Sequence, residues 1–247
     1  MTSVGSATCV QRITIINVKG GCGKTTIATN LASAYARLNM NTTLLDFDPQ
    51  GSSMYWLKAR PSQLPGLHGI AAYRHKGAAV TRSFLLRLPQ QTQRAIIDTP
   101  AGLSGLDLID QLRGTDTILI PVLPSSIDIH ATADFIRDLF LIAKVRPQHT
   151  RLCIVCNRVK ANTVAFRSLE RFLKALDIPV IASLRETQNY VTSSEQGLGV
   201  HELDSRSNKQ DIEAWQQLIN WLENSASVAL KPDGGDSFQP AHLNHPG

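Results

Sequence analysis

Residues 13–26, ITIINVKGGCGKTT, contain the stretch that decides the fold. The run Ile13–Val18 is short and largely apolar, which is typical of a strand that is covered on both faces. It leads into a glycine-rich loop, and the pattern near Thr25–Leu38 indicates an amphipathic helix directly afterwards. Strand, glycine loop and helix, in this order, are the setting in which a phosphate-binding loop is credible. We therefore expect a nucleotide to bind here.

The loop supplies the groups that would hold the phosphates. Glycines let backbone N–H groups approach phosphate oxygens with no Cβ in the way, and the helix N-terminus adds partial positive charge. Lys24 is expected to reach the β- and γ-phosphates, and the Thr25 hydroxyl to ligate Mg²⁺. A flexible glycine turn is the alternative. The predicted nucleotide-binding residues of the loop are Lys19, Gly20, Gly21, Cys22, Gly23, Lys24, Thr25 and Thr26.

The loop departs from the usual G-x-x-x-x-G-K-[ST] spacing. Val18 stands where the first glycine is expected, and an additional lysine, Lys19, follows it. A second lysine can add charge at the phosphates of its own subunit or of a partner across a dimer. The other interpretation is an exposed lysine at a strand end.

The rest of the chain predicts a doubly wound α/β fold, with a mostly parallel sheet flanked by helices. A chain of 247 residues with 43% hydrophobic and 18% charged residues suits one globular domain, although two small domains are possible. Short apolar runs alternate with helical patterns, which is typical of parallel strands joined by crossover helices. The predicted strands are Ile13–Val18, Thr42–Leu45, Ala95–Ile97, Thr117–Val122, Leu152–Cys156 and Val180–Ala182, and the predicted helices are Thr25–Leu38, Leu106–Arg113, Asp128–Ala143, Val164–Leu176 and Lys209–Asn224.

The domain is expected to span residues 12–224. Residues 1–11 form a short extension, and residues 225–247, rich in Gly, Pro, Ser and His, are expected to be a disordered tail. Residues 62–87 are harder to interpret and are expected to include an irregular loop and a helix around Ala79–Leu88. No apolar run approaches the roughly 18 residues of a membrane span, and the first twelve residues do not resemble a signal peptide. We therefore expect a cytoplasmic protein.

Asp98 is the predicted metal-binding carboxylate. It ends an apolar strand at the carboxyl edge of the sheet, where ligands bind in such folds. A carboxylate there can hold Mg²⁺ through the water shell of the ion, because magnesium dehydrates reluctantly. The alternative is a helix cap.

Four stretches together resemble the ParA/MinD family of deviant Walker A P-loop ATPases, and the ParA-like branch in particular. KGGCGKTT (19–26) resembles the deviant phosphate loop of the family, and LLDFDPQGS (44–52) its D-x-D-P-Q-G segment. AIIDTPAG (95–102) resembles its Walker B strand and the switch that follows, and VCNR (155–158) the strand end that contacts adenine. The resemblance runs from about Arg12 to Glu223, and it implies a Mg²⁺-dependent ATPase.

The resemblance also implies roles for individual residues. Asp48 would orient or activate the attacking water, and Asp46 would support the water shell of the metal, since a carboxylate accepts hydrogen bonds from water. The alternative for Asp48 is a cap of the turn into Pro49. The expected catalytic residues are thus Asp48, Lys19 and Lys24, and the expected metal-binding residues are Thr25, Asp98 and Asp46.

The base and the γ-phosphate have expected contacts of their own. Asn157 is implied to contact an adenine edge, and Thr99–Gly102 to sense the γ-phosphate. Residues 182–185, ASLR, replace the usual Pro–Arg stretch of the family, which leaves a second adenine contact in doubt.

The pair Cys153 and Cys156 has the spacing of redox and metal sites. Both lie in an apolar run that predicts a buried strand, and residues i and i+3 of a strand point to opposite faces. We therefore expect two core side chains. This argues against an iron–sulfur reductase with the same phosphate loop, since such a protein needs cysteines near its dimer face.

The family resemblance implies an ATP-dependent homodimer in which Lys19 of each subunit reaches the phosphates of the other. ParA-like dimers bind DNA without sequence preference, and a ParB-like or adaptor protein stimulates hydrolysis. This cycle positions a plasmid, a chromosome region or a large assembly such as a carboxysome or chemoreceptor array over the nucleoid. The alternative is a MinD-like switch that acts on a membrane or protein partner without DNA.

DNA binding requires basic side chains on one surface, and a net charge of +5 permits it. Three candidates recur at i, i+4 and i+7 on one predicted helix and share a face, one follows the last predicted strand, and two lie in DSRSNK (204–209), which resembles a D-P-R-S-R segment of the family. A solvated basic surface is the alternative. The six candidates are Arg167, Arg171, Lys174, Arg185, Arg206 and Lys209.

The last predicted helix argues against a membrane partner. Residues 211–224, DIEAWQQLINWLEN, place Ile212, Trp215, Leu218, Ile219 and Leu222 on one face. A membrane-surface helix would carry lysines on its polar face, whereas this segment has three acidic residues and no Lys or Arg. We expect it to pack on the core.

Overall fold

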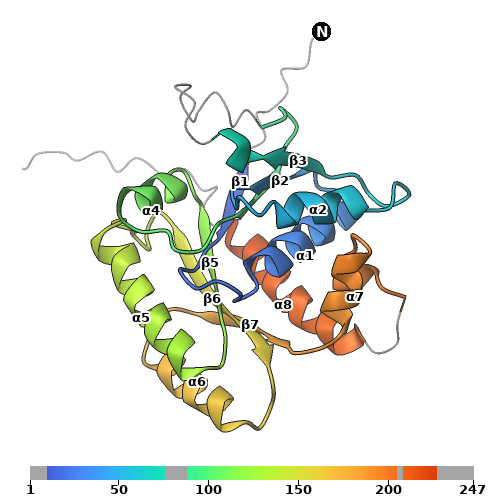
Figure 1. Cartoon of the computed structure of the whole chain (residues 1–247). Helices are drawn as coiled ribbons and strands as arrows, with labels where there is room; N and C mark the ends of the chain where they lie inside the picture. The colour runs from blue at the N-terminus through green and yellow to red at the C-terminus, as the bar shows by residue number, and fades with distance from the viewer. Residues whose placement is uncertain (1–9, 76–87, 205–207, 227–247) are drawn as a thin grey trace, which may run out of the picture.

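The computed structural model describes residues 10–75, 88–204 and 208–226 (Figure 1). Seven strands form one sheet in the order β3-β2-β4-β1-β5-β6-β7, and every neighbouring pair is parallel. The strand order reverses direction around β1, which confirms the doubly wound fold and puts the ligand-binding crevice at the carboxyl ends of the central strands. The strands are β1 (Gln11–Ile15), β2 (Thr42–Asp46), β3 (His68–Ala71), β4 (Arg94–Asp98), β5 (Thr117–Val122), β6 (Arg151–Val159) and β7 (Val180–Arg185).

Helices cover both faces of the sheet (Figure 1). One face carries α1 (Lys24–Arg37), α2 (Ser52–Ala59), α7 (Asn189–Glu195) and α8 (Lys209–Ala226), and the other carries α4 (Gly105–Leu112), α5 (Ser126–Leu141) and α6 (Val164–Lys174). Two short 3₁₀ turns, η1 (Ala72–His75) and η2 (Val200–Glu202), complete the described elements.

Alternate residues of each strand enter different cores, as expected for a sheet covered on both sides. Cys153 lies in the core beneath α1 and α8, and Cys156 lies in the core beneath α5 and α6. Both thiols are free and buried. The prediction of two core cysteines on opposite faces is therefore confirmed.

α8 packs against the core, as predicted. Trp215, Leu218, Ile219 and Leu222 are buried in the same core as α1, whereas Ile212 is 37% exposed. Among the residues that the structure describes, no helix has the length and apolar character needed to cross a membrane.

Several boundaries differ from the prediction. β1 ends at Ile15 rather than Val18, and beyond it the side chain of Asn17 donates to the carbonyl oxygen of Pro121 on β5. β7 extends to Arg185, so this residue ends the strand instead of following it. The helix predicted around Ala79–Leu88 lies outside the described residues apart from Leu88, and so do the predicted tail after residue 226 and Arg206.

Three elements were not predicted, α2, β3 and α7. Each is short, and their sequences give little periodicity, since α2 buries only Ser53 and Trp56 and β3 has no fully buried residue. Their positions are set by contacts with distant parts of the chain rather than by a local pattern.

α2 is fixed to the segment after α7. The indole Nε1 of Trp56 donates to the carbonyl oxygen of Leu198 at 3.1 Å, and the Arg60 guanidinium forms a two-point ion pair with Glu202 at 2.7 and 2.8 Å. Gly197 allows this close approach, since a Cβ there would lie 2.4 Å from the backbone nitrogen of Arg60. The side chains of Arg60 and Glu202 are only 4% and 2% exposed.

We expect the Arg60→Met substitution to destabilise the protein by about 3–5 kcal/mol, because it leaves the buried Glu202 carboxylate without its cation. Urea unfolding followed by circular dichroism measures this free energy. The double substitution Arg60→Met and Glu202→Met serves as the control and should recover part of the loss. A single variant within about 1 kcal/mol of the wild type would contradict the argument.

Candidate nucleotide site

The glycine loop lies between β1 and α1, at the carboxyl edge of the sheet. Gly23 directly precedes α1 and has a φ angle of 94°, a left-handed conformation that favours glycine. The loop also contacts the segment after β4, since the backbone N–H of Gly102 donates to the carbonyl oxygen of Val18 at 2.9 Å. The predicted phosphate loop and the predicted switch are thus neighbours.

Lys24 is folded back into the loop. Its side chain donates to the backbone oxygen of Asn17 at 3.2 Å and to that of Lys19 at 3.0 Å. Lys24 is only 7% exposed, so these carbonyl oxygens satisfy a buried ammonium group. The same flexible side chain can reach an anion held by the loop. Lys19 is half-buried, and its own backbone is part of this arrangement.

Asp98 and Thr25 meet at the start of α1. Asp98 is fully buried, and its Oδ2 accepts a hydrogen bond from the Ser53 hydroxyl at 2.5 Å. Burial raises the pKa of Asp98 to about 7, although hydrogen bonds from Ser53 and Thr25 and the charge of Lys24 act to lower it. Within the described chain, Oδ1 meets no group in hydrogen-bonding geometry. A buried carboxylate oxygen without a regular partner, close to a threonine hydroxyl, fits a hydrated cation.

Asp46 and Asp48 have different environments. Asp46 pairs in register with Asp98 across β2 and β4, and its two oxygens accept the backbone N–H groups of Asp48 and Met54 at 3.0 and 3.2 Å. Burial raises the pKa of Asp46, whereas these two N–H groups lower it. Asp48 is half-buried and accepts the N–H of Gln50 at 3.0 Å, which is the turn cap that the sequence left open as an alternative. Asp48 can cap this turn and also accept a hydrogen bond from a water molecule, because a carboxylate has several acceptor positions.

Asn157 contacts the glycine loop directly. Its Nδ2 donates to the carbonyl oxygen of Cys22 at 2.9 Å, and its Oδ1 accepts the backbone N–H of Arg158. A Cβ on Gly23 would lie 2.0 Å from this Nδ2. A break in the β6–β7 register between Cys156 and Val159 accompanies this arrangement. Asn157 therefore supports the loop, whatever contact it makes with a base.

Two residues at the site were missed by the sequence reasoning. Ser53 holds the Asp98 carboxylate although 45 residues separate them, and Asn17 anchors the loop to β5. The position of Asn17 directly before the loop was a usable signal, because asparagine commonly bonds the backbone two residues later. Nothing in the sequence marked Ser53. Thr99, which the family resemblance placed in the switch, donates its hydroxyl to the carbonyl oxygen of Ile15 at 2.8 Å.

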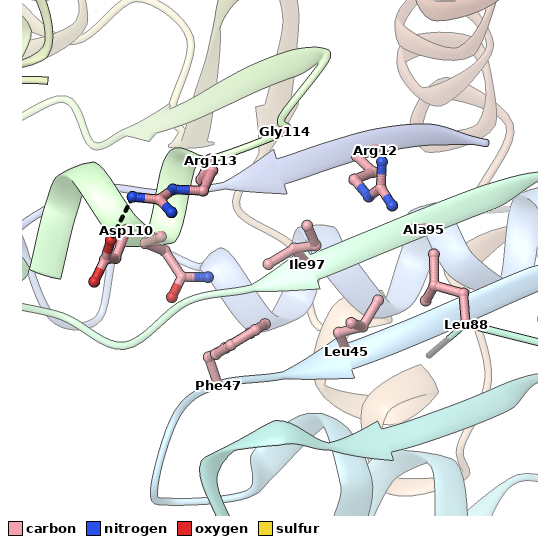
Figure 2. A pocket seen from close by; sticks show the side chains of 10 residues that line it. Arg12, Leu45, Phe47, Leu88, Ala95, Ile97, Asp110, Arg113 and Gly114 are labelled. Carbon is pink, nitrogen blue, oxygen red and sulfur yellow. Dashed lines mark hydrogen bonds and ion pairs between the residues drawn. The ribbon is translucent and has the colours of Figure 1, made fainter. Parts of the chain in front are cut away.

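A cavity of about 460 Å³ lies away from this site (Figure 2). It is lined by Leu45 of β2, by Phe47 directly after β2, by Ile97 of β4 and by the end of α4. Leu88, which also lines it, directly follows residues outside the described part of the chain. No loop residue from 19 to 26 is among its described lining.

The candidate DNA contacts do not share one face of the sheet. Arg167, Arg171 and Lys174 are exposed on α6, and Lys209 is exposed at the start of α8, which packs on the opposite face. Arg185 forms a two-point ion pair with the buried Asp211 at 2.7 and 2.8 Å, so it has a structural role at the start of α8.

Gly23→Ala is expected to destabilise the protein by about 1–3 kcal/mol, because alanine is strained at this φ angle and its Cβ would collide with Asn157. Urea unfolding is the measurement. Gly20→Ala is the matched control in the same loop, since its Cβ would only meet Ala101 at 3.9 Å. Equal stability of the two variants would refute the packing of Asn157 on the loop.

Asp98→Asn should stabilise the nucleotide-free protein more at pH 8 than at pH 5. The raised pKa means that the folded state binds the proton more tightly, so Asp98 destabilises the fold increasingly as pH rises from its ordinary pKa to about 7. The difference between 3.8 and about 7 sets an upper bound of roughly 4 kcal/mol. Urea unfolding at the two pH values, with the exposed Asp110→Asn as control, checks the sign. A gain that is the same at both values would be inconsistent with a raised pKa of Asp98 in the folded state.

Comparison with known proteins agrees with this geometry. The family described as the CobQ/CobB/MinD/ParA nucleotide binding domain matches residues 13–200. Maintenance of carboxysome distribution protein A from Halothiobacillus neapolitanus is 28% identical over 216 residues, which cover 84% of this chain and 94% of that protein.

Solved structures share the fold. A putative plasmid partition protein from Borrelia burgdorferi B31 bound to AMPPNP has a TM-score of 0.69 at 16% identity, covering 86% of this chain and 100% of that chain. The septum site-determining protein MinD from Pyrococcus horikoshii OT3, complexed with Mg-ADP, has a TM-score of 0.61 at 15% identity and covers 91% and 100%. With a family match over most of its length and the P-loop architecture in place, this chain belongs to the CobQ/CobB/MinD/ParA nucleotide-binding family.

Proposed function

We propose that this chain is a ParA-like ATPase whose ATP-bound homodimer binds DNA non-specifically and positions a cargo, with a partner protein that stimulates hydrolysis. The observation that supports the proposal most strongly is the convergence of Lys24, Thr25 and Asp98 at one edge of the sheet, beside the glycine loop. This arrangement offers the cationic and carboxylate groups that bind a nucleoside triphosphate and its metal ion.

The described residues fit ATP and Mg²⁺. Gly21 has open space where a Cβ would stand, and Lys24 can exchange its carbonyl partners for phosphate oxygens. Asp98 offers a buried oxygen beside the Thr25 hydroxyl, and Asp46 lies next to it in register. Mg²⁺, when bound, would neutralise charge on the phosphate oxygens. Thr25, Asp98 and Asp46 are the residues proposed to hold it and its water shell.

Asp48 is the proposed general base or water-orienting residue. It leaves β2 at the same edge as Asp98, and the turn that begins at Asp48 is fixed by the bonds from Gln50 and Gly51. This geometry holds the carboxylate at the rim of the site while leaving it half-exposed, and thus accessible to water. A carboxylate positioned by a rigid turn loses little conformational entropy when it orients a water molecule.

Lys19 is the residue proposed to act across a homodimer. It is half-buried, and the next two residues of the loop, Gly20 and Gly21, are exposed. Large apolar side chains are also exposed at the starts of helices around this edge, namely Tyr55, Leu106 and Ile127. A second copy that covers this edge would bury them and bring a second lysine to the phosphates.

For DNA, α6 is the better supported surface. Arg167, Arg171 and Lys174 are all exposed and follow one helix face, and Leu169 and Leu173 of the same helix are buried. Three adjacent cations can neutralise phosphates along a duplex without reading its sequence. Lys209, at the start of α8, would belong to a different part of the surface. We propose a cytoplasmic, nucleoid-associated location on this basis.

The comparisons support a positioning role but differ in the cargo. One relative is a carboxysome distribution protein, and a plasmid partition protein shares the fold. The alternative is a MinD-like switch on a membrane or protein partner, since MinD shares the fold. The burial of the apolar side chains of α8 favours the ParA-like proposal, because that helix face is already occupied by the core.

A mobility shift of non-specific duplex DNA with ATP, with ADP and with no nucleotide is the direct test. We expect a shift with ATP only, its loss in Lys24→Ala, and its retention in Asp48→Ala, whose hydrolysis should fall by a factor on the order of 100. The shift should weaken as salt rises, because binding releases counterions.

Two triple variants test whether α6 forms the DNA-binding surface. Alanine at Arg167, Arg171 and Lys174 should weaken binding and reduce the slope of log K against log salt by about 3. Alanine at Arg113, Lys144 and Arg146 removes the same charge from another exposed surface and serves as the control. No shift at low salt in any nucleotide state would rule out DNA binding and leave the ATPase to be tested by hydrolysis.

A further inference from the structure

Asn17 lies between β1 and the glycine loop, and its side chain anchors the loop to β5. It is 2% exposed, although an amide is costly to bury unless its hydrogen bonds are made. Its contacts join three parts of the site, namely the loop, the end of β5 and α5. This buried amide therefore links the loop to β5 and α5.

The orientation of the amide is fixed by the chemistry of its neighbours. Nδ2 lies 2.8 Å from the carbonyl oxygen of Pro121, which can only accept, and 3.5 Å from the Thr132 hydroxyl. The nitrogen must therefore face β5, and Oδ1 must face the loop. Oδ1 accepts the backbone N–H of Lys19 at 3.2 Å. This bond from residue 17 to residue 19 is a local turn, and it is anchored on a strand of the rigid sheet.

The backbone of Lys19 is thus held from both sides. Its N–H donates to Asn17, and its carbonyl oxygen accepts from the Lys24 ammonium at 3.0 Å and the Cys22 thiol at 3.3 Å. The bond from Lys24 is given up when that ammonium moves to a phosphate group. The bond from the Asn17 side chain does not involve Lys24. It is therefore the side-chain contact to the Lys19 N–H that can persist through nucleotide binding, beside the weaker bond from the Cys22 thiol to the Lys19 carbonyl oxygen.

We propose that Asn17 is the positioning residue for Lys19, and that it fixes the direction of the Lys19 backbone against β5 when Lys24 is engaged with phosphate. This proposal rests on the proposed ATPase function. Asn17 acts through Lys19 and has no contact with the reacting atoms. Its effect therefore belongs to the catalytic step rather than to nucleotide affinity, because the phosphate-binding N–H groups and Lys24 remain in place.

The test compares ATP hydrolysis and binding of a fluorescent ATP analogue in the full chain. Asn17→Ala should lower kcat by at least about ten-fold, since small misplacements of a catalytic group are costly, and change the dissociation constant by less than about three-fold. Asn17→Ala combined with Lys19→Ala should be no slower than Lys19→Ala alone, because both changes remove one function. Asn17→Ser retains an oxygen two residues before Lys19 but loses the Nδ2 bond to Pro121, so its kcat should lie between that of Asn17→Ala and that of the wild type.

Thr43→Val is the structural control. It removes a buried hydrogen bond, that between Thr43 and Thr92 at 2.9 Å, on β2 and outside the site. It should lower the melting temperature without changing kcat. If Asn17→Ala does not fold, Asn17→Ser decides, since a kcat equal to that of the wild type in this variant, which lacks the Nδ2 bond to Pro121, would overturn the proposal.

The outcomes separate the two proposals. A wild-type protein that hydrolyses no ATP under any condition would contradict the proposed function itself. Wild-type turnover with an unchanged kcat in Asn17→Ala, or multiplicative losses in the double variant, would overturn the positioning role alone. A loss of nucleotide affinity as large as the loss of kcat would do the same.

Discussion

The structure depends on keeping two ionisable groups, Asp98 and Lys24, buried at the edge of an apolar parallel sheet. Neither is solvated by bulk water, so each needs partners from the chain. Asp98 takes the Ser53 hydroxyl, and Lys24 takes backbone carbonyl oxygens of the loop. Because parallel strands end at the same edge, β1 and β4 bring the loop and the carboxylate together without a long connection. The same pairing leaves one Asp98 oxygen for a ligand.

α1 and α2, which both begin at this edge, are held by a common anchor, the segment after α7. α1 holds the segment after α7 through Asn30, whose side-chain oxygen accepts the N–H of Val200 at 2.7 Å, and α2 holds it through Trp56 and Arg60. A displacement of either helix would therefore strain the same backbone. Since α1 starts at the glycine loop and α2 follows Asp48, this anchor restrains both ends of the site against independent movement.

The sequence was sufficient to predict those site residues whose positions follow from spacing along the chain. Lys24 and Thr25 follow their loop at fixed positions, and Asp98 ends an apolar run, so the edge of the sheet could be predicted from local patterns. The sequence was insufficient to predict interactions between residues that are far apart along the chain. The Ser53–Asp98 bond, the Asn157–Cys22 bond and the Arg185–Asp211 pair each join residues that no periodicity relates. α2, β3 and α7 were missed for the same reason, since they are short and stabilised by tertiary contacts.

Arg185 shows why a candidate contact must be separated from a structural role before it is tested. Asp211 is buried and accepts hydrogen bonds from both Arg185 and Asn189. Removing the guanidinium would leave a buried carboxylate with fewer partners at the start of α8, next to Lys209. A loss of DNA binding in such a variant would follow equally from a lost phosphate contact and from a displaced helix. The exposed cations of α6 have no such buried partner among the described residues, so their removal reports on the surface itself.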